Sequence, residues 1–412
     1  MLLGANKTDI TPGFPIDLAG FAHREGLATT VENHLFIKTF YFELDETKML
    51  MIIADLIWWG DQLVSELQNE IEVGFSIPKE HICFHATHNH SGPQTSFRFS
   101  KQLGETSIKY VRFLKGQIIQ SVQKAMGDVE KVSIDRRSGT SKLGIYRRKR
   151  VDNQIVRAPN RKVPTDNELS IISFKTEENR TKAIWIHYSC HPTTTDANVV
   201  SSEYPGVCSE EVEKFFPGAT VAFLQGFCAD VRPALVKDHE FYRGTLEEMK
   251  EVGKRFANEV LDVLESGKKS NFKGALKIKS VALPLIFEET EIEAYIPDEL
   301  KEEWPKLVEK NRQDGYELKF QYIQLGDQLS FLSCNAELSQ AYGTFIKKID
   351  PHILPLGYAN GMVGYVPTKK QLYGGGYEPI ESIFYFGLPA MLAYKIEEKI
   401  QATFEKILGG EK

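Results

Sequence analysis

The sequence predicts an α/β protein in which mixed β-sheets are covered by helices, and three observations lead to this prediction. Short apolar segments rich in β-branched or aromatic residues and bounded by turn residues are typical of strands. Other segments carry apolar residues at helical spacing, as in 244–266, where Val252, Phe256 and Val260 recur. The two kinds of segment are interspersed along the whole chain, which indicates sheets packed against helices.

Each element follows from its own composition and pattern. The expected strands are 35–44, 49–57, 82–85, 169–174, 183–188, 219–224, 276–285, 318–325 and 329–332, with a Gly326-Asp327 turn between the last two. The expected helices are 61–73, 106–125, 208–216, 244–266, 298–314 and 339–349, followed by a helical segment over 388–407. The polar stretch 266–271 is a candidate linker, but the core-like strand after it favours one large domain over 1–412.

Composition excludes several classes of function. The 412 residues include 50 Lys and Arg against 56 Asp and Glu, a net charge of −6, which disfavours binding to nucleic acid. No segment approaches the roughly 20 apolar residues of a membrane span, and no secretory signal is expected at the N-terminus. The five cysteines are widely spaced, odd in number and without a CxxC pair, which favours a reducing compartment and a cytoplasmic location.

Histidines follow the predicted strand 82–85 in the segment His-Ala-Thr-His-Asn-His-Ser-Gly-Pro. Residues two apart in an extended segment point to the same side, so His88 and His90 are expected to face one cavity and His85 the other way. A His-x-His pair at a strand end is a recurrent metal-ligand spacing, because two imidazoles can converge on one ion. The alternative is a loop whose histidines make ordinary hydrogen bonds.

Three further polar residues lie where predicted strands end. His191 begins a His-Pro loop and is a better ligand candidate than His187, which we expect to be a hydrogen-bonded strand residue. Glu337 precedes a helix, where a carboxylate can simply complement the helix N-terminus. Tyr365 lies in a segment whose glycines permit close backbone approach. Taken alone, Tyr365 is most simply interpreted as a buried, hydrogen-bonded tyrosine.

Together these motifs resemble, in order, those of the catalytic domain of the neutral/alkaline ceramidase family. The opening of the chain and a glutamine-containing block near its middle are also similar to that family. The resemblance covers nearly the whole chain, but the family's additional C-terminal immunoglobulin-like domain has no counterpart here. The matching blocks are 4–12 with 18–21, 87–93, 191–193, 225–233, 335–338 and 358–368.

The resemblance implies specific roles for residues of this chain. It implies one zinc ion per chain, held by His88, His191, Glu337 and Tyr365. His90 would be the adjacent acid/base histidine. Arg147 would lie near the scissile group, although Arg148 could be the matching residue. Two neutral imidazoles, a carboxylate and a phenol oxygen suit zinc, which lowers the pKa of bound water to about 7.

The glutamine block departs from the family pattern. Where the ceramidases have Gln-Ser-Asn, this chain has Gln225-Gly226-Phe227, so the family's active-site serine is missing. Ceramide is therefore in doubt as the substrate, and a chain without the second domain has little reason to meet bilayer ceramide. Cys228 is a weak substitute for the serine, because lone cysteines are usually small buried hydrophobic residues.

The leading hypothesis is a zinc-dependent, ceramidase-like amidohydrolase that cleaves an N-acyl bond of a small molecule, lipid-like or not. Zinc-activated water attacks the carbonyl, Tyr365 and Arg147 help to stabilise the oxyanion, and His90 protonates the leaving amine. Two alternatives stay open: a metal-dependent esterase, lactonase or phosphoesterase, and a non-catalytic zinc-binding member of the family. The basic cluster 147–150 is compatible with an anionic substrate, although a solvated turn is the simpler interpretation of this cluster.

Two other features are candidates for supporting roles. Asp55, at the end of a predicted strand, could orient a histidine by accepting its second N–H. The glycines at 374–376 resemble a family loop near the site and could form a mobile lid over the pocket.

Overall fold

Two β-sheets packed face to face form the centre of the protein in a computed structural model that describes residues 1–289 and 292–409. The larger sheet has the order β11-β10-β9-β5-β1-β2-β3-β4, and β15 pairs with β5. Its strands are β1 (Leu2–Asp9), β2 (Phe36–Leu44), β3 (Thr47–Ala54), β4 (Ile82–Ala86), β5 (Glu130–Thr140), β9 (Glu168–Thr176), β10 (Thr181–Tyr188), β11 (Thr220–Gln225) and β15 (Lys268–Phe272). The second sheet contains β16 (Gly274–Pro284), β17 (Glu317–Gly326), β18 (Leu329–Cys334) and β20 (Ile353–Leu356).

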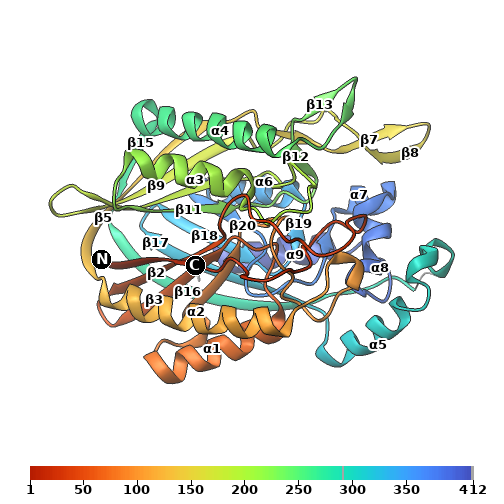
Figure 1. The fold of residues 1–412 in the computed structure, drawn as a ribbon, viewed down its shortest axis with the longest axis horizontal. Coiled ribbons are helices and arrows are strands. Elements are labelled where there is room, and N and C mark those ends of the chain that lie inside the picture. Colours follow the sequence, from red (N-terminus) through yellow and green to blue (C-terminus); the bar gives the residue numbers. More distant parts are fainter. Residues whose placement is uncertain (290–291, 410–412) are drawn as a thin grey trace.

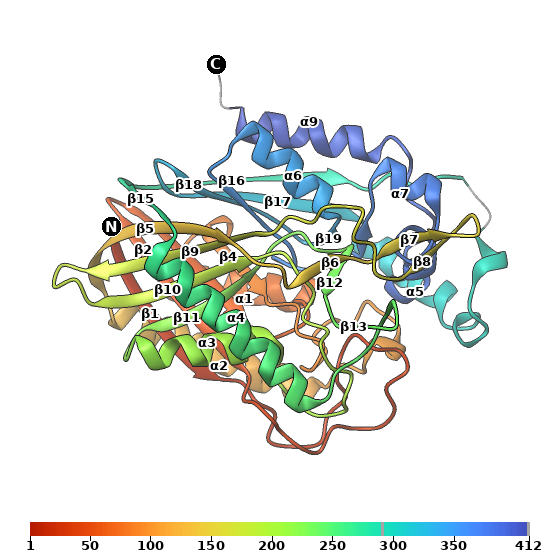
Figure 2. The same ribbon diagram turned by 90° about the horizontal axis from the view of Figure 1, so that it is seen from above.

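Helices cover the outer face of each sheet, so that four layers are seen from above (Figure 2). The larger sheet is covered by α2 (Ile108–Gly127), α3 (Glu203–Phe215) and α4 (Leu246–Ser266), with α1 (Asp61–Phe75) beside α2 (Figure 1). The second sheet is covered by α6 (Gln340–Ile349) and α9 (Ile396–Leu408). This arrangement confirms the predicted α/β class with helix-covered mixed sheets.

The space between the two sheets is filled by aromatic and aliphatic side chains. Trp185 on β10 is completely buried there, and its ring lies 5.5 Å from that of Phe42 and 5.7 Å from that of Phe331. Phe42 belongs to the larger sheet and Phe331 to the second sheet, so one indole joins the two. Burying such rings stabilises the packing of the sheets by about 1.5–3 kcal/mol each.

The predicted strands and helices are present with shifted ends, except that the segment expected to be helical over 388–407 forms a helix only from Ile396 onward, as α9. Helix α3 begins at Glu203 rather than at 208, since its Pro205 lies in the first turn, where proline is tolerated. The predicted helix 298–314 divides into a short 3-10 turn, Asp298–Leu300, and α5 (Trp304–Asp314). The candidate linker at 266–271 is wrong, because β15 forms there and pairs with β5 from Lys268 to Phe272.

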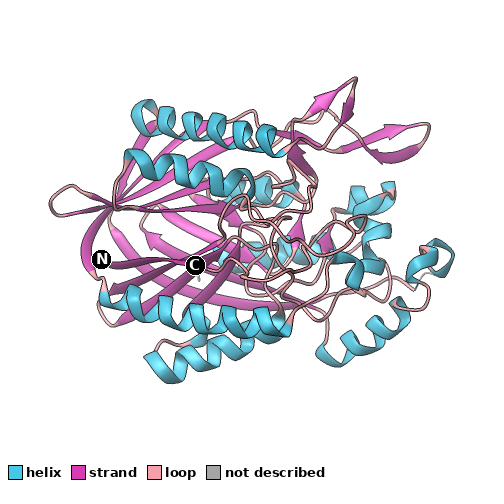
Figure 3. Cartoon of the chain, viewed as in Figure 1, coloured by secondary structure: helices cyan, strands magenta, loops and turns pink. Residues whose placement is uncertain are grey.

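The remaining elements are short and lie at the end of the sheets where the loops gather (Figure 3). They include α7 (Lys369–Gly374), α8 (Ser382–Phe386) and several strand pairs. The pairs are β6 (Gly144–Tyr146) with β12 (Val231–Pro233), β7 (Arg148–Val151) with β8 (Gln154–Arg157), β13 (Val236–Lys237) with β14 (Glu240–Phe241), and β19 (Glu337–Leu338) with β21 (Tyr365–Val366). Two of these pairs, β7–β8 and β13–β14, project from the body of the protein (Figure 1). None of the helices in the described part of the chain is long and apolar enough to cross a membrane.

Candidate active site

The residues singled out at strand ends come together where the loops gather. His88 and His191 follow strands β4 and β10 of the larger sheet. Glu337 follows strand β18 of the second sheet and Tyr365 follows strand β20. The two residues lie on β19 (Glu337–Leu338) and β21 (Tyr365–Val366), which pair in parallel and place them opposite each other. The site is therefore assembled from parts of the chain that are far apart in sequence.

The backbone at His88 is not extended, contrary to the expectation for the His-x-His segment. Strand β4 has already ended, and His88 has a φ of 63°, in the left-handed region. Its ring stacks on Tyr358 with centroids 3.8 Å apart. The side chains of His88 and His90 nevertheless converge as predicted, with their Nε2 atoms 3.2 Å apart. His85 lies elsewhere and accepts a hydrogen bond from the backbone N–H of Gln225.

Backbone carbonyl groups fix which nitrogen carries the proton in two of these rings. Nδ1 of His88 lies 3.0 Å from the carbonyl oxygen of Ile57. Nδ1 of His191 lies 2.8 Å from the carbonyl oxygens of both Cys228 and Val231. Because a carbonyl can only accept, each Nδ1 donates, and each neutral ring presents the lone pair of its Nε2 atom.

These lone pairs face the carboxylate of Glu337. Its Oε2 atom lies 3.2 Å from Nε2 of His191 and 3.5 Å from Nε2 of His88. Burial lowers the pKa of His88 to about 3 and that of His191 well below its usual value, so both rings are neutral. Burial also raises the pKa of Glu337. A cation among these three buried groups would satisfy both lone pairs and favour the ionised carboxylate.

His90 adjoins this group and lines the open side of the site. The ligand-type nitrogens of His88, His90 and His191 lie within 4.8 Å of one another, so the three histidines could hold a metal ion. Nδ1 of His90 is buried and has no hydrogen-bond partner among the described residues. Gly20 makes room for the ring, because a Cβ atom there would lie 2.4 Å from this Nδ1.

Arg147, rather than Arg148, reaches the site. Its Nη2 donates to the Tyr365 hydroxyl at 3.2 Å, and its Nη1 lies 3.4 Å from Nε2 of His191. Glu378 holds the other edge of this guanidinium, accepting a 2.9 Å hydrogen bond from Nε. Arg148 points to the opposite side of Glu378 and also pairs with it. The expectation of a solvated turn is thus wrong for these two arginines, which are buried because they share one buried carboxylate.

The structure also shows the surroundings of four further features for which a role was discussed. Asp55 orients no histidine side chain, because its carboxylate binds Lys38 Nζ at 2.7 Å and the backbone N–H of Phe36. Gly226, which stands where the family has its serine, does not line the cavity. Cys228 is completely buried, and burial raises the pKa of its thiol, which disfavours a nucleophilic thiolate. The glycines at 374–376 lie against Arg148, which donates to the carbonyl of Gly375, and this contact leaves the idea of a lid untested.

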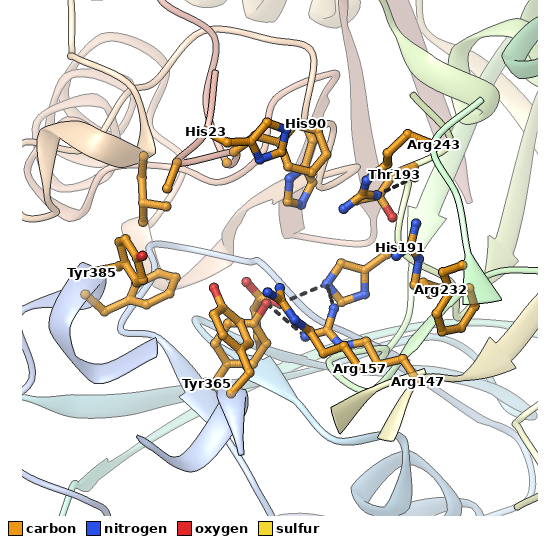
Figure 4. A pocket seen from close by; sticks show the side chains of 18 of the residues that line it. His23, His90, Arg147, Arg157, His191, Thr193, Arg232, Arg243, Tyr365 and Tyr385 are labelled. Carbon is orange, nitrogen blue, oxygen red and sulfur yellow. Dashed lines mark hydrogen bonds and ion pairs between the residues drawn. The ribbon is translucent and has the colours of Figure 1, made fainter. Parts of the chain in front are cut away.

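A cavity of about 350 Å³ adjoins the candidate catalytic and metal-binding residues (Figure 4). His90, His191, Glu337, Arg147 and Tyr365 all contribute to its wall. His88 is completely buried and does not line the cavity. The wall also contains residues that were not expected to be site residues, namely Phe21, His23, Trp58, Thr193, Arg157, Arg232, Phe241, Arg243, Tyr377 and Tyr385. Phe21, Thr193 and Arg232 lie within blocks that carried the family resemblance, but no role in the site was expected for them.

A sequence model of the N-terminal region of neutral/alkaline non-lysosomal ceramidases matches residues 1–239, which is more than half of the chain. The chain belongs to the neutral/alkaline non-lysosomal ceramidase family. This confirms the resemblance found in the sequence, and membership of the family supports a hydrolase. No curated protein matches the sequence significantly.

Two solved ceramidase structures are similar to this member of the family. The crystal structure of neutral ceramidase from Pseudomonas aeruginosa has a TM-score of 0.77 and 16% sequence identity, and the match covers 99% of this chain and 74% of that one. A ceramidase complexed with C2 has a TM-score of 0.78 and 15% identity, with the same two coverages. At these identities the similarity shows that the fold is shared.

Proposed function

We propose that the protein is a zinc-dependent hydrolase that cleaves the amide bond of an N-acyl small molecule. The observation that carries this proposal is the convergence of Nε2 of His88, Nε2 of His191 and Oε2 of Glu337 beside a cavity. Tyr365 stands opposite Glu337 in the β19–β21 pair, so its phenol oxygen is suited to complete the set. One zinc ion per chain would be held by His88, His191, Glu337 and Tyr365.

The donor chemistry supports zinc over a harder cation. Two imidazole nitrogens with free lone pairs, fixed by carbonyl groups, are typical zinc ligands, whereas Mg²⁺ and Ca²⁺ prefer oxygen atoms alone. The carbonyl groups that hold His88 and His191 are backbone groups of buried segments, so the rings cannot rotate freely. When bound, zinc would lower the pKa of a water molecule to about 7 and polarise the substrate carbonyl.

The remaining groups suit the proton transfers of amide hydrolysis. His90 lines the cavity and has a buried Nδ1 without a partner, so its ring can take up a proton and deliver it to the leaving amine. Arg147 keeps its guanidinium in place through Glu378 and presents Nη1 and Nη2 toward His191 and Tyr365. A fixed positive charge there would stabilise an oxyanion that develops next to it.

The family, and the existence of a similar ceramidase complexed with C2, support an N-acyl substrate that can be lipid-like. A cytoplasmic location is supported by the five cysteines, which are all free and buried.

Metal analysis of three proteins tests the proposal. Wild type, His88→Ala and His90→Ala are loaded with zinc, dialysed, and assayed for bound zinc and for hydrolysis of a chromogenic N-acyl anilide. We expect one zinc per chain in the wild type, loss of zinc and activity in His88→Ala, and retained zinc with a rate lowered by about 10²- to 10⁴-fold in His90→Ala.

The same series contains the outcomes that contradict the proposal. A wild-type protein that binds no zinc would leave a family fold without this chemistry. Loss of zinc from His90→Ala as complete as from His88→Ala would make His90 a ligand instead of a proton carrier. A matched ester substrate distinguishes the amidase from the alternative esterase. An alkoxide leaving group needs less protonation than an amine, so cleavage of the ester should be less sensitive to the His90 substitution than cleavage of the amide.

A further inference from the structure

The cavity carries more positive charge than its catalytic groups require. Four arginines line it, and Glu337 is the one carboxylate among the described lining residues. Arg147 is neutralised from behind by Glu378. The other three arginines have no carboxylate oxygen within 4.0 Å among the described residues; they are Arg157, Arg232 and Arg243. Figure 4 shows Arg232 and Arg243 on the same side of the cavity as His191, away from Tyr385.

Each of these three guanidinium groups is held against an aromatic ring. Arg157 lies 4.4 Å from the ring centroid of Tyr377, and Arg232 lies 4.4 Å from that of Phe241. Arg243 lies 4.5 Å from the ring of Phe21. Stacking orients a guanidinium without using its N–H groups, which stay available at the edge of the plane.

The hydrogen bonds of these arginines leave most of their donors free. Arg243 donates from Nη1 to the carbonyl of Thr193 at 2.7 Å, and Arg232 has one long contact of 3.5 Å from Nη2 to the carbonyl of Tyr242. Nε of Arg232 is buried without a partner among the described residues. A buried N–H group without an acceptor costs free energy, and a bound ligand that accepts its hydrogen bond would remove that cost.

The three side chains come from separate elements that meet at the cavity wall. Arg157 ends β8 (Gln154–Arg157), the second strand of the β7–β8 hairpin. Arg232 is the middle residue of β12 (Val231–Pro233), and Arg243 follows the β13–β14 hairpin. Burial, together with the charges of Arg243, Arg147 and Arg157, lowers the pKa of Arg232 to about 9. The guanidinium groups are therefore close enough to repel one another in the absence of an anion.

We propose that Arg157, Arg232 and Arg243 form a subsite for an oxyanion, a carboxylate or a phosphate, carried by the N-acyl substrate near its amide bond. This inference rests on the proposed hydrolase function and names the class of its substrate. An oxyanion would accept the unused N–H groups in bidentate fashion and relieve the repulsion among the arginines. A substrate with only hydroxyl groups at this position would leave that charge without compensation, and so the cavity favours acidic N-acyl compounds over neutral ones.

Binding of uncleavable analogues to the zinc-loaded protein tests the subsite. Three ketones are compared by calorimetry, each with a methylene in place of the amide nitrogen and a hexanoyl chain, and they end in a carboxylate, a phosphate or a hydroxyl group. We expect at least one anionic analogue to bind about ten- to a hundredfold more tightly than the hydroxyl analogue. The stronger of the two anionic analogues identifies the oxyanion. Equal affinity for all three would overturn the proposal without any variant being needed.

Variants assign the effect to the arginines. Arg232→Gln and Arg243→Gln should each weaken the anionic analogue about tenfold or more and leave the hydroxyl analogue within about twofold. Arg150→Gln is a matched control, because Arg150 is exposed on the same hairpin as Arg157 and does not line the cavity. An equal loss for anionic and hydroxyl analogues would overturn the proposal. Anion preference without cleavage of any N-acyl amide would refute the hydrolase function and leave the subsite standing.

Discussion

At the residue scale, the candidate site depends on small groups that place larger ones. The backbone carbonyl groups of Ile57, Cys228 and Val231 determine which ring nitrogens of the two histidines at 88 and 191 keep a free lone pair. Gly20 decides where the His90 ring can lie, because its missing Cβ leaves the space next to Nδ1. Positions of this kind control the geometry of the groups that carry the chemistry.

We expect Gly20→Ala to displace His90 and lower the rate of hydrolysis while leaving zinc bound. The added Cβ would lie 2.4 Å from Nδ1 of His90, and the backbone has a φ of 95°, which a side chain strains. Gly26→Ala is a matched control, since Gly26 also has a positive φ, 71°, but has open space around it. Rate and metal content are measured on both variants. Equal rates in the two variants would contradict a positioning role for Gly20.

The sequence indicated some of these residues and missed others for a clear reason. His88, His90, His191, Glu337 and Tyr365 lie in short motifs at strand ends, where chemistry-bearing side chains stand out. Of the three cavity arginines that were not expected, Arg232 lies in the block 225–233 without marking itself as a site residue, and Arg157 and Arg243 lie in no motif. These positions are 75 and 11 residues apart along the chain, at 157, 232 and 243. Only the tertiary structure brings them together.

At the element scale, two interior strands of the larger sheet, β9 and β5, are joined to helix α6 by partly buried charges. Glu168, at the start of β9, accepts from Arg136 of β5 at 2.5 Å and pairs with Lys347 of α6 at 2.9 Å. Although burial opposes it, the charges of Lys347 and Arg136 lower the pKa of Glu168 to about 2. These contacts tie a strand of one sheet to a helix that covers the other.

Acid should weaken this connection in a defined pH range. Glu168 binds its proton near pH 2 when folded and near pH 4.3 when unfolded, so the ion pairs contribute fully above about pH 4.3 and are lost as the pH falls toward 2. We expect Glu168→Gln to lower the free energy of unfolding at pH 7 by about 1–2 kcal/mol, with a difference that shrinks across that range. Denaturant unfolding of wild type and variant at several pH values measures it.

Glu177→Gln is the control for this experiment, because Glu177 forms an exposed pair with Lys131. Such a pair contributes little. A Glu168→Gln difference that stayed constant from pH 7 to pH 2 would show that the carboxylate charge is not the cause.

Strands were predicted well where a pattern of apolar side chains marks them. They were predicted poorly where only backbone pairing with a neighbouring strand reveals them. Strands such as β3 and β10 are continuous runs of buried apolar residues and were recognised. The strands β1, β5 and β15 were missed because they carry many polar residues. In β5 the buried Asp135 and Arg136 are accommodated by ionic contacts, which a hydrophobic pattern cannot reveal.

At the scale of the whole molecule, the site lies at the junction of two sheets that are nearly separate in sequence. All strands of the larger sheet except β15 end by Gln225, and the second sheet begins at Gly274. Segments that follow strands of the first sheet contribute His88 and His191, and segments that follow strands β18 and β20 of the second contribute Glu337 and Tyr365. A metal ion bound by all four would connect the two parts of the fold.

We therefore expect zinc to raise the temperature of thermal unfolding. A ligand that binds only the folded state stabilises it by about 2.7 kcal/mol at a free concentration of 100 times its Kd. Scanning calorimetry of wild type with zinc, and with a chelator, measures the shift. His191→Ala should show no such shift, and a shift of the same size in that variant would place the zinc elsewhere.

The division of the site between early and late parts of the chain also affects its biosynthesis. A ribosome makes the protein from its N-terminus, so both histidines emerge well before Glu337 and Tyr365 exist. Once His191 has emerged, the nascent chain contains only the two imidazole members of the proposed ligand set, and its second sheet, which begins at Gly274, has not yet been translated. The complete ligand set is available only after residue 365 has emerged, and so the metal centre would mature close to the end of translation.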